Sequence, residues 1–204
     1  MPGFKGKPQR HEVAKKEVKT VRTFIAVPLP AECRETLEQI QRPLRALDAD
    51  VRWTSVSSIH LTLKFLGEID PFRVDEIISA LRPAVVPAFG LRLRGLGAFP
   101  NFRNPRVVWC GVEGETEKLS LLQAGVETAC AGLGFEREAR PFHPHLTLGR
   151  VNGKRNLQPL QDYIKIGTEL ECAFLADCVN IYKSVLMPRG AEYTVLKRIE
   201  LNEG

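Results

Sequence analysis

The tetrapeptide His-Leu-Thr-Leu occurs twice in this chain, at residues 60–63 and 145–148, which lie 85 residues apart. Successive side chains of a β-strand point to opposite faces, so each copy puts histidine and threonine on one face and two leucines on the other. Such a strand needs a hydrophobic core behind it. The repetition therefore predicts two equivalent strands in two similar halves of one protein.

The motif histidines, His60 and His145, are two of only four histidines in 204 residues. The unperturbed pKa of imidazole lies close to neutrality, so two histidines in matched settings form a natural acid/base pair. A single His-x-Thr-x on a strand is common and has no particular meaning. Two identical copies in equivalent halves instead indicate one composite site.

Hydrophobic spacing predicts strands and helices along the whole chain. Strands are expected at 23–27, 51–53, 59–66, 91–96, 107–110, 145–148, 176–184 and 193–199. Helices are expected at 37–47, from the Asp70-Pro71 cap to about residue 82, at 115–131 and near 157–164. Pro43 should kink or split the first helix, because proline lacks the backbone N–H that an interior position needs.

The coarse order is strand–helix–strand–strand–helix–strand, followed by a second similar run. This pattern predicts an α+β protein built from two similar halves. A pseudo-two-fold axis between the halves would bring both His/Thr faces together across a shared central cleft. Two imidazoles and two hydroxyls around one space suit phosphodiester chemistry, above all the opening of a strained cyclic phosphate.

Positive charge is concentrated at the N-terminus. The formal net charge of the chain is +5, and residues 1–22 alone hold seven basic and two acidic side chains. We expect residues 1–21 to form a solvated, partly disordered basic tail and residues 22–204 to form one bilobal domain. Phosphate binding by the tail is the alternative. Two glutamates and the absence of serine argue against a mitochondrial transit peptide.

Composition and cysteine spacing indicate a cytoplasmic protein. No stretch approaches the roughly 20 apolar residues that span a membrane, and no secretory h-region is present. The five cysteines follow no CxxC spacing, which disfavours zinc ribbons and disulfide scaffolds. We expect most of them to be buried as small hydrophobic side chains in a reducing compartment. Nothing in the sequence indicates a membrane partner, and we expect a monomer.

Beyond the paired motif, several segments carry a family resemblance. They are Arg22 to Ala26, Trp53, the run from His60 to Gly67, Phe99-Pro100, Pro105 to Trp109, Phe142 to Arg150, Tyr182 to Ser184, and Gly190 to Tyr193. The chain resembles the two-histidine phosphoesterases, in particular their RNA 2′,3′-cyclic phosphodiesterase branch, often named 2′-5′ RNA ligase. The resemblance covers residues 22–199 and leaves out only the basic tail.

The resemblance implies a bilobal α+β fold, with an antiparallel sheet and outer helices in each half and the motifs lining a central cleft. It also implies opening of RNA 2′,3′-cyclic phosphate ends, or of a cyclic nucleotide, to a 2′-phosphomonoester without metal or other cofactor. On this basis His60 and His145 are the catalytic pair, and Thr62 and Thr147 hold the phosphate. We take His145 as base and His60 as acid, an assignment that sequence does not decide.

Three residues near the motifs have two interpretations each. Strict alternation points both Phe65 and Arg150 away from the cleft, but Gly149 allows a bulge that would turn Arg150 inward to the substrate. Phe65 either stacks on a nucleobase or belongs to the core. Lys64 either raises the positive potential of the site or is an exposed surface lysine.

Two alternatives remain for the function and one for the site. Joining of tRNA halves through a 2′-5′ bond uses the same chemistry in reverse, and a non-catalytic RNA- or nucleotide-binding module could use the same cleft. His143 and His145 flank Pro144, but no third ligand is near, so a zinc site is disfavoured. We expect His143 to lie at the surface or to support the site indirectly.

Overall fold

A computed structural model describes residues 20–187 and 190–201 of the chain. The predicted disordered basic tail lies, except for its last two residues, outside the described residues. The strands are β1 (Val21–Val27), β2 (Val51–Trp53), β3 (Leu61–Ile69), β4 (Phe89–Phe99), β5 (Val107–Gly114), β6 (His145–Val151), β7 (Cys172–Ala176), β8 (Cys178–Met187) and β9 (Gly190–Glu200). The helices are α1 (Ala31–Ala46), α2 (Val74–Leu81), α3 (Thr116–Gly132) and α4 (Leu157–Ile166).

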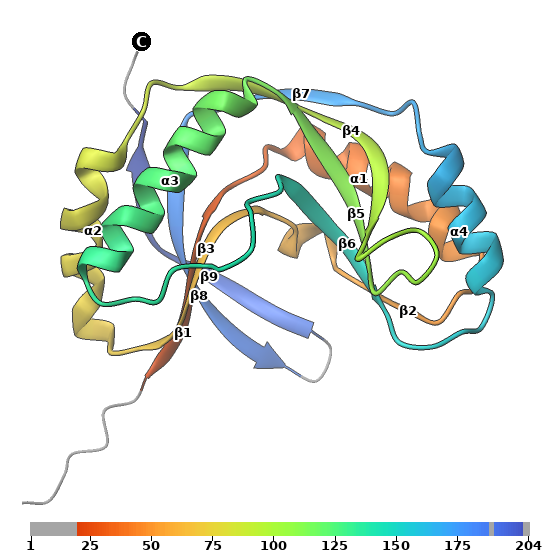
Figure 1. Cartoon of the computed structure of the whole chain (residues 1–204), viewed down its shortest axis with the longest axis horizontal. Coiled ribbons are helices and arrows are strands. Elements are labelled where there is room, and N and C mark those ends of the chain that lie inside the picture. The colour runs from red at the N-terminus through yellow and green to blue at the C-terminus, as the bar shows by residue number, and fades with distance from the viewer. Residues whose placement is uncertain (1–19, 188–189, 202–204) are drawn as a thin grey trace, which may run out of the picture.

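The strands form two antiparallel sheets. One has four strands in the order β3-β1-β8-β9, and the other has five in the order β2-β6-β5-β4-β7. Helices α2 and α3 pack together beside the first sheet, whereas α1 and α4 pack against β7 and β4 of the second. Figure 1 shows these two lobes side by side in an arch, with α2 and α3 at one end and α4 at the other. The predicted bilobal α+β architecture is confirmed.

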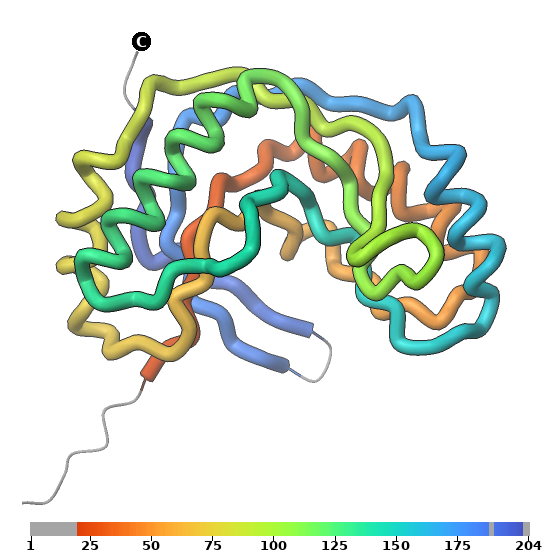
Figure 2. Tube along the Cα trace, in the orientation of Figure 1, coloured from red at the N-terminus to blue at the C-terminus, as the bar shows by residue number. Residues whose placement is uncertain are grey.

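The lobes are not the two halves of the sequence. The four-stranded sheet joins β1 and β3 near the N-terminus with β8 and β9 near the C-terminus, through antiparallel pairing of β1 with β8. Figure 2 shows these chain ends running side by side. The second run of elements also differs from the first, because β7, β8 and β9 follow one another without a helix. The predicted strand at 176–184 is in fact the end of β7 and most of β8.

The four predicted helices are present, although α1 begins at Ala31, six residues before the predicted start, and two further local differences occur. Helix α1 continues through Pro43, so the predicted split is wrong. The carbonyl that loses its usual donor belongs to Gln39, an exposed residue, and can be hydrated instead. Asp70 does act as a cap and accepts a hydrogen bond from the Phe72 N–H, but it caps a short 3₁₀ turn (Pro71–Arg73) that leads into α2.

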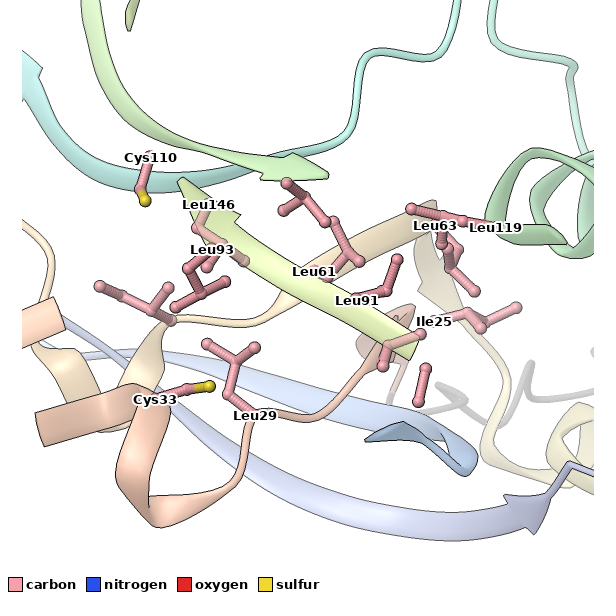
Figure 3. Close-up of a cluster of buried hydrophobic side chains, with 14 of the residues drawn as sticks. Ile25, Leu29, Cys33, Leu61, Leu63, Leu91, Leu93, Cys110, Leu119 and Leu146 are labelled. Atoms are coloured by element: carbon pink, nitrogen blue, oxygen red, sulfur yellow. The ribbon is translucent and has the colours of Figure 1, made fainter. Parts of the chain in front are cut away.

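A single hydrophobic core lies behind both motif strands. Leu61 and Leu63 of β3 and Leu146 and Leu148 of β6 are at most 4% exposed and belong to one cluster. Figure 3 shows Leu61, Leu63 and Leu146 together with Leu91 and Leu93 of β4. Burying a leucine side chain stabilises the fold by about 1.5–3 kcal/mol. The core therefore holds both motif strands in register.

Two of the five cysteines form a disulfide, which corrects the expectation of buried thiols for this pair. Cys33 of α1 and Cys172 of β7 form a disulfide, with their Cα atoms 5.5 Å apart. Their separation of 139 residues follows no spacing rule, so the sequence did not reveal the pair. Cys110, Cys130 and Cys178 are free and buried, as expected. None of the described helices has the length and apolar character to cross a membrane.

Candidate active site

The two motif strands belong to different sheets and contact each other where the lobes meet. In each motif the leucines are buried, and the histidine and threonine are half-buried on the opposite face. The predicted division of the motif between core and open face is therefore confirmed for both copies.

Each motif strand has a β-bulge immediately after its threonine. In β3, Thr62 and Lys64 pair with the successive residues Ala26 and Ile25 of β1, so Leu63 is the extra residue. In β6, Thr147 and Gly149 pair with Trp109 and Val108 of β5, so Leu148 is extra. A bulge inserts one unpaired residue and reverses the alternation beyond it.

The bulges decide the orientation of Phe65 and Arg150. Phe65 lies opposite Phe24, on the face of His60 and Thr62, and is 62% exposed. Arg150 is exposed and lies opposite Val107, on the face of His145 and Thr147. The bulge expected near Gly149 is thus present, and the interpretation of Phe65 as a core residue is wrong.

A glutamine from a helix of the same lobe supports each bulge. Gln41 of α1 is fully buried, and its Nε2 donates to the Leu148 carbonyl and the Thr54 carbonyl, both at 2.9 Å. Gln123 of α3 makes the equivalent but longer contact, 3.5 Å from Nε2 to the Leu63 carbonyl. The Leu148 carbonyl also accepts from the Thr54 N–H at 2.8 Å, so Gln41 adds a side-chain donor that stabilises this bulge.

His60 lies in an aromatic environment formed by three strands. Its ring stacks on Phe24 at a centroid distance of 4.4 Å, and Tyr193 meets it edge-on at 5.1 Å. Tyr182 lies beyond, stacked on Phe24 at 5.0 Å. Burial lowers the pKa of His60 to about 4, although a backbone hydrogen bond at Ser58 opposes the change. His60 is therefore neutral at pH 7.

His145 lies in a second aromatic group. The rings of Phe99 and Trp109 make T-shaped contacts with the His145 ring at centroid distances of 4.9 and 6.4 Å. Its Nδ1 is 2.7 Å from the His143 carbonyl. Because a carbonyl only accepts, Nδ1 carries the proton and Nε2 is left for chemistry. Burial lowers the pKa of His145 also, and the charges of His143 and Arg150 add to that effect.

Arg150 links the two lobes electrostatically. Burial raises the pKa of the Tyr193 hydroxyl, and the positive charges of Arg22 and Arg150 oppose that rise. Arg150 therefore acts on a group from each sheet, His145 on one side and Tyr193 on the other. Positive charge at this junction favours an anionic ligand.

Lys64 contributes neither to the site nor to the surface. Its side chain is 4% exposed, and Nζ donates to Glu127 Oε1 and Oε2 at 3.0 and 2.9 Å and to the Glu136 carbonyl at 2.8 Å. Both sequence interpretations of this residue are wrong. The bulge at Leu63 turns Lys64 to the core face of β3, where α3 supplies its partner.

His143 is exposed and supports the site through its backbone carbonyl, as expected. Within residues 20–187 and 190–201, no three His, Cys, Asp or Glu side chains gather in a way that could hold a metal ion. Sequence reasoning missed Phe24, Trp109, Tyr182, Tyr193 and Gln41 as site residues. Four of these lie in the family-like segments, which was the available signal, but nothing local distinguished them from core residues.

Comparisons with known proteins agree with this geometry. A family model described as LigT like Phosphoesterase matches residues 27–109 and 111–190. An RNA 2′,3′-cyclic phosphodiesterase of Methanothermobacter thermautotrophicus is 35% identical over 184 residues, which cover 89% of this chain and 99% of the relative. One of the same name from Thermotoga maritima is 33% identical over 186 residues, covering 90% and 97%.

Solved structures show the same fold. TT0787 of Thermus thermophilus matches with a TM-score of 0.76 and 29% identity, covering 89% of this chain and 98% of that one. E. coli LigT complexed with 3′-AMP matches with a TM-score of 0.76 and 27% identity, covering 90% and 99%.

Proposed function

This chain belongs to the LigT-like phosphoesterase family, and from that premise we propose that it hydrolyses RNA 2′,3′-cyclic phosphate ends to 2′-phosphomonoesters. The observation that carries the proposal is the matched setting of His60 and His145. Each ring bonds to the backbone of the residue two positions upstream, each packs among aromatic rings, and each shares a strand face with a threonine.

In the proposed reaction water attacks phosphorus while the bond from phosphorus to the 3′-oxygen breaks. One histidine takes a proton from the attacking water, and the other gives a proton to the departing 3′-oxygen. The product keeps its phosphate on the 2′-oxygen. Both histidines regain their starting states when the proton passes through solvent, so no cofactor is consumed.

We assign the base to His60 and the acid to His145. The base must be neutral at the working pH, and burial keeps the pKa of His60 at about 4. A bound anion raises the pKa of both histidines, and His145, whose pKa burial lowers less than that of His60, is the one that it brings to the protonated form. This assignment reverses the one taken from sequence, which had no information on burial.

The anion is held by local groups in this proposal. Thr62 and Thr147 donate hydroxyl hydrogen bonds to the non-bridging oxygens, and the Arg150 guanidinium supplies positive charge. Phe65, exposed on the face of His60, is suited to stack on the terminal base. The ligands are therefore an RNA end or a cyclic nucleotide.

The first test is product analysis with EDTA present. RNA with a 2′,3′-cyclic phosphate end should be converted to the 2′-phosphomonoester at the same rate with and without the chelator. Loss of turnover in EDTA would overturn the metal-free mechanism. A joined RNA product from two cleaved strands would instead favour the 2′-5′ ligase, and tight binding without turnover would favour a binding module.

The second test is substitution of the histidines. His60→Ala and His145→Ala should each lower kcat by at least about 100-fold, the usual scale of acid/base catalysis. Gln158→Ala is the control, because Gln158 is an exposed residue of α4 whose side chain bonds to Asp162, and it should stay within about threefold of wild type. If either motif variant behaves like the control, the two-histidine mechanism is wrong.

A substrate with sulfur in place of the 3′-oxygen tests the assignment of roles. A thiolate is a much less basic leaving group than an alkoxide and needs little help from an acid. His145→Ala should therefore regain most of its lost rate on this substrate, and His60→Ala should not. Recovery of His60→Ala instead would restore the assignment made from sequence.

We also propose that the enzyme acts as a monomer. Size-exclusion chromatography coupled to light scattering, at micromolar concentrations, should give the mass of one chain. A stable dimer would contradict the proposal.

A further inference from the structure

The β8–β9 hairpin extends beyond the strand on which it is built. The pairing of β1 with β8 ends at Arg22 and Ser184, whereas the pairing of β8 with β9 continues to Met187 and Gly190. Figure 1 shows these two strands projecting from the body of the molecule. Several large apolar side chains of the hairpin are exposed: Val185 by 40%, Leu186 by 68%, Met187 by 45% and Val195 by 49%.

The register of the hairpin divides these side chains between its two faces. Directly opposed residues share a face, and the opposed pairs include Tyr182 with Val195, Ser184 with Tyr193, and Leu186 with Ala191. Tyr193 meets His60 edge-on at 5.1 Å, so this face is continuous with the candidate active site. We call Leu186, Tyr193 and Val195 the site-side face; Val185 and Met187 lie on the opposite face.

Positive charge flanks the site-side face. Arg22 of β1 lies opposite Ser184 of β8 and therefore on the same side of the sheet; Glu68 of β3 lies opposite Arg22 on its other flank, farther from the hairpin. Both Arg22 and Arg150 act electrostatically on the Tyr193 hydroxyl. An apolar and aromatic surface within reach of two arginine charges matches a single-stranded nucleic acid, whose bases stack on apolar groups while its phosphates bind the cations.

We propose that the site-side face of the β8–β9 hairpin binds the nucleotides on the 5′ side of the cyclic phosphate. This inference rests on the proposed function and deepens it, since it makes an RNA strand, rather than a free cyclic nucleotide, the preferred substrate. Any base can stack on an apolar surface, so we expect the enzyme to prefer longer RNA substrates but not a particular base sequence.

The test compares a cyclic mononucleotide with a short RNA oligonucleotide that ends in the same cyclic phosphate. Wild type should show a kcat/KM at least about tenfold higher for the RNA, as expected when stacking of one or more bases is gained. The double variant Leu186→Ser/Val195→Ser should lose that gain while hydrolysing the mononucleotide within about twofold of wild type.

The hairpin supplies its own matched control. Val185→Ser/Met187→Ser changes two residues of comparable exposure on the opposite face and should keep the full preference for RNA. Circular dichroism and a thermal melt establish that both double variants are folded. Equal behaviour of the two double variants, or a wild type that gains nothing from chain length, would overturn the proposal.

A binding measurement separates this proposal from the proposed function. Fluorescence anisotropy with a short RNA oligonucleotide ending in a 2′-phosphate requires no turnover. Weaker binding by the site-side variant alone, by about tenfold, supports the proposal even if no hydrolysis is found. A wild-type dimer that dissociates in the site-side variant would assign the face to a second copy of the chain and refute it.

Discussion

Replacing Lys64 with methionine tests the most unexpected contact of the motif strands. The sequence placed this residue beside the catalytic motif, but the structure buries it and joins β3 to α3 through Glu127. Methionine is similar in length and cannot carry charge. The Lys64→Met variant therefore leaves the buried Glu127 carboxylate without its cation and removes the donor to the Glu136 carbonyl.

The expected cost follows from the burial of both partners. Lys64 and Glu127 side chains are 4% and 10% exposed, and removing one partner of such a pair destabilises a protein by about 3–5 kcal/mol. For a protein of this size each kcal/mol lowers Tm by roughly 2–4 °C, so Tm should fall by about 6–20 °C. Replacing both partners, in Lys64→Met/Glu127→Leu, should recover most of the loss, because no unpaired charge then remains.

Thermal melts and urea unfolding measure the stability, and kcat/KM is measured well below the lowered Tm. Lys165→Met is the control: its ion pair with Asp162 is more than half exposed and should contribute less than about 1 kcal/mol. Activity of folded Lys64→Met should stay within about threefold of wild type. A Tm within about 2 °C of wild type, or a roughly tenfold loss of kcat/KM in folded protein, would refute this account of Lys64.

Three further predictions concern other parts of the molecule. Gln41→Met should lower kcat/KM about tenfold by releasing the bulge that orients Arg150, and this loss should largely vanish in an Arg150→Ala background. The control is Gln161→Met, which changes a buried glutamine bonded to the Arg103 carbonyl. Full additivity of the Gln41 and Arg150 substitutions would contradict a role of Gln41 in orienting Arg150. Burial lowers the pKa of His60 to about 4 from about 6.5 in the unfolded chain, so the folded state binds fewer protons between these pH values and the free energy of unfolding should fall as pH falls from about 6.5 to 4. The free energy of urea unfolding should fall less between about pH 7 and about pH 4.5 in His60→Gln than in wild type. An equal fall in the two proteins would contradict a buried neutral His60. Dithiothreitol should destabilise the protein by about 2–5 kcal/mol through loss of the Cys33–Cys172 disulfide, and Cys33→Ser/Cys172→Ser should melt at the same temperature with and without reductant.

The side-chain orientations near the two motifs show where strand alternation predicts the correct face and where it does not. Alternation correctly predicted the faces of His60, Thr62, His145 and Thr147, because each lies on the regular side of its bulge. It failed for Phe65 and Lys64. One extra residue reverses alternation, and whether a residue is extra depends on the register of the partner strand. Gly149 indicated a possible bulge in β6, whereas the corresponding position of β3 is Lys64 and gave no such indication.

The aromatic environment of His60 shows a second limit. Phe24, Tyr182 and Tyr193 come from β1, β8 and β9, which lie at opposite ends of the sequence. No local spacing relates them, so they resembled ordinary strand residues. The same holds for Gln41, whose role depends on the contact between α1 and the bulge in β6. Side chains that act through long-range contacts leave no periodic signal.

The sequence by itself determined the α+β class, most strands and helices, the two His/Thr faces and their leucine core, because these follow from local hydrophobic spacing and from a repeated motif. Only the tertiary structure decided that β1 and β8 share a sheet, that Lys64 is buried while Phe65 and Arg150 face the site, and that His60 is neutral. The reason is that strand register and burial are properties of residues distant in the chain, and bulges and pKa shifts exist only once those residues meet.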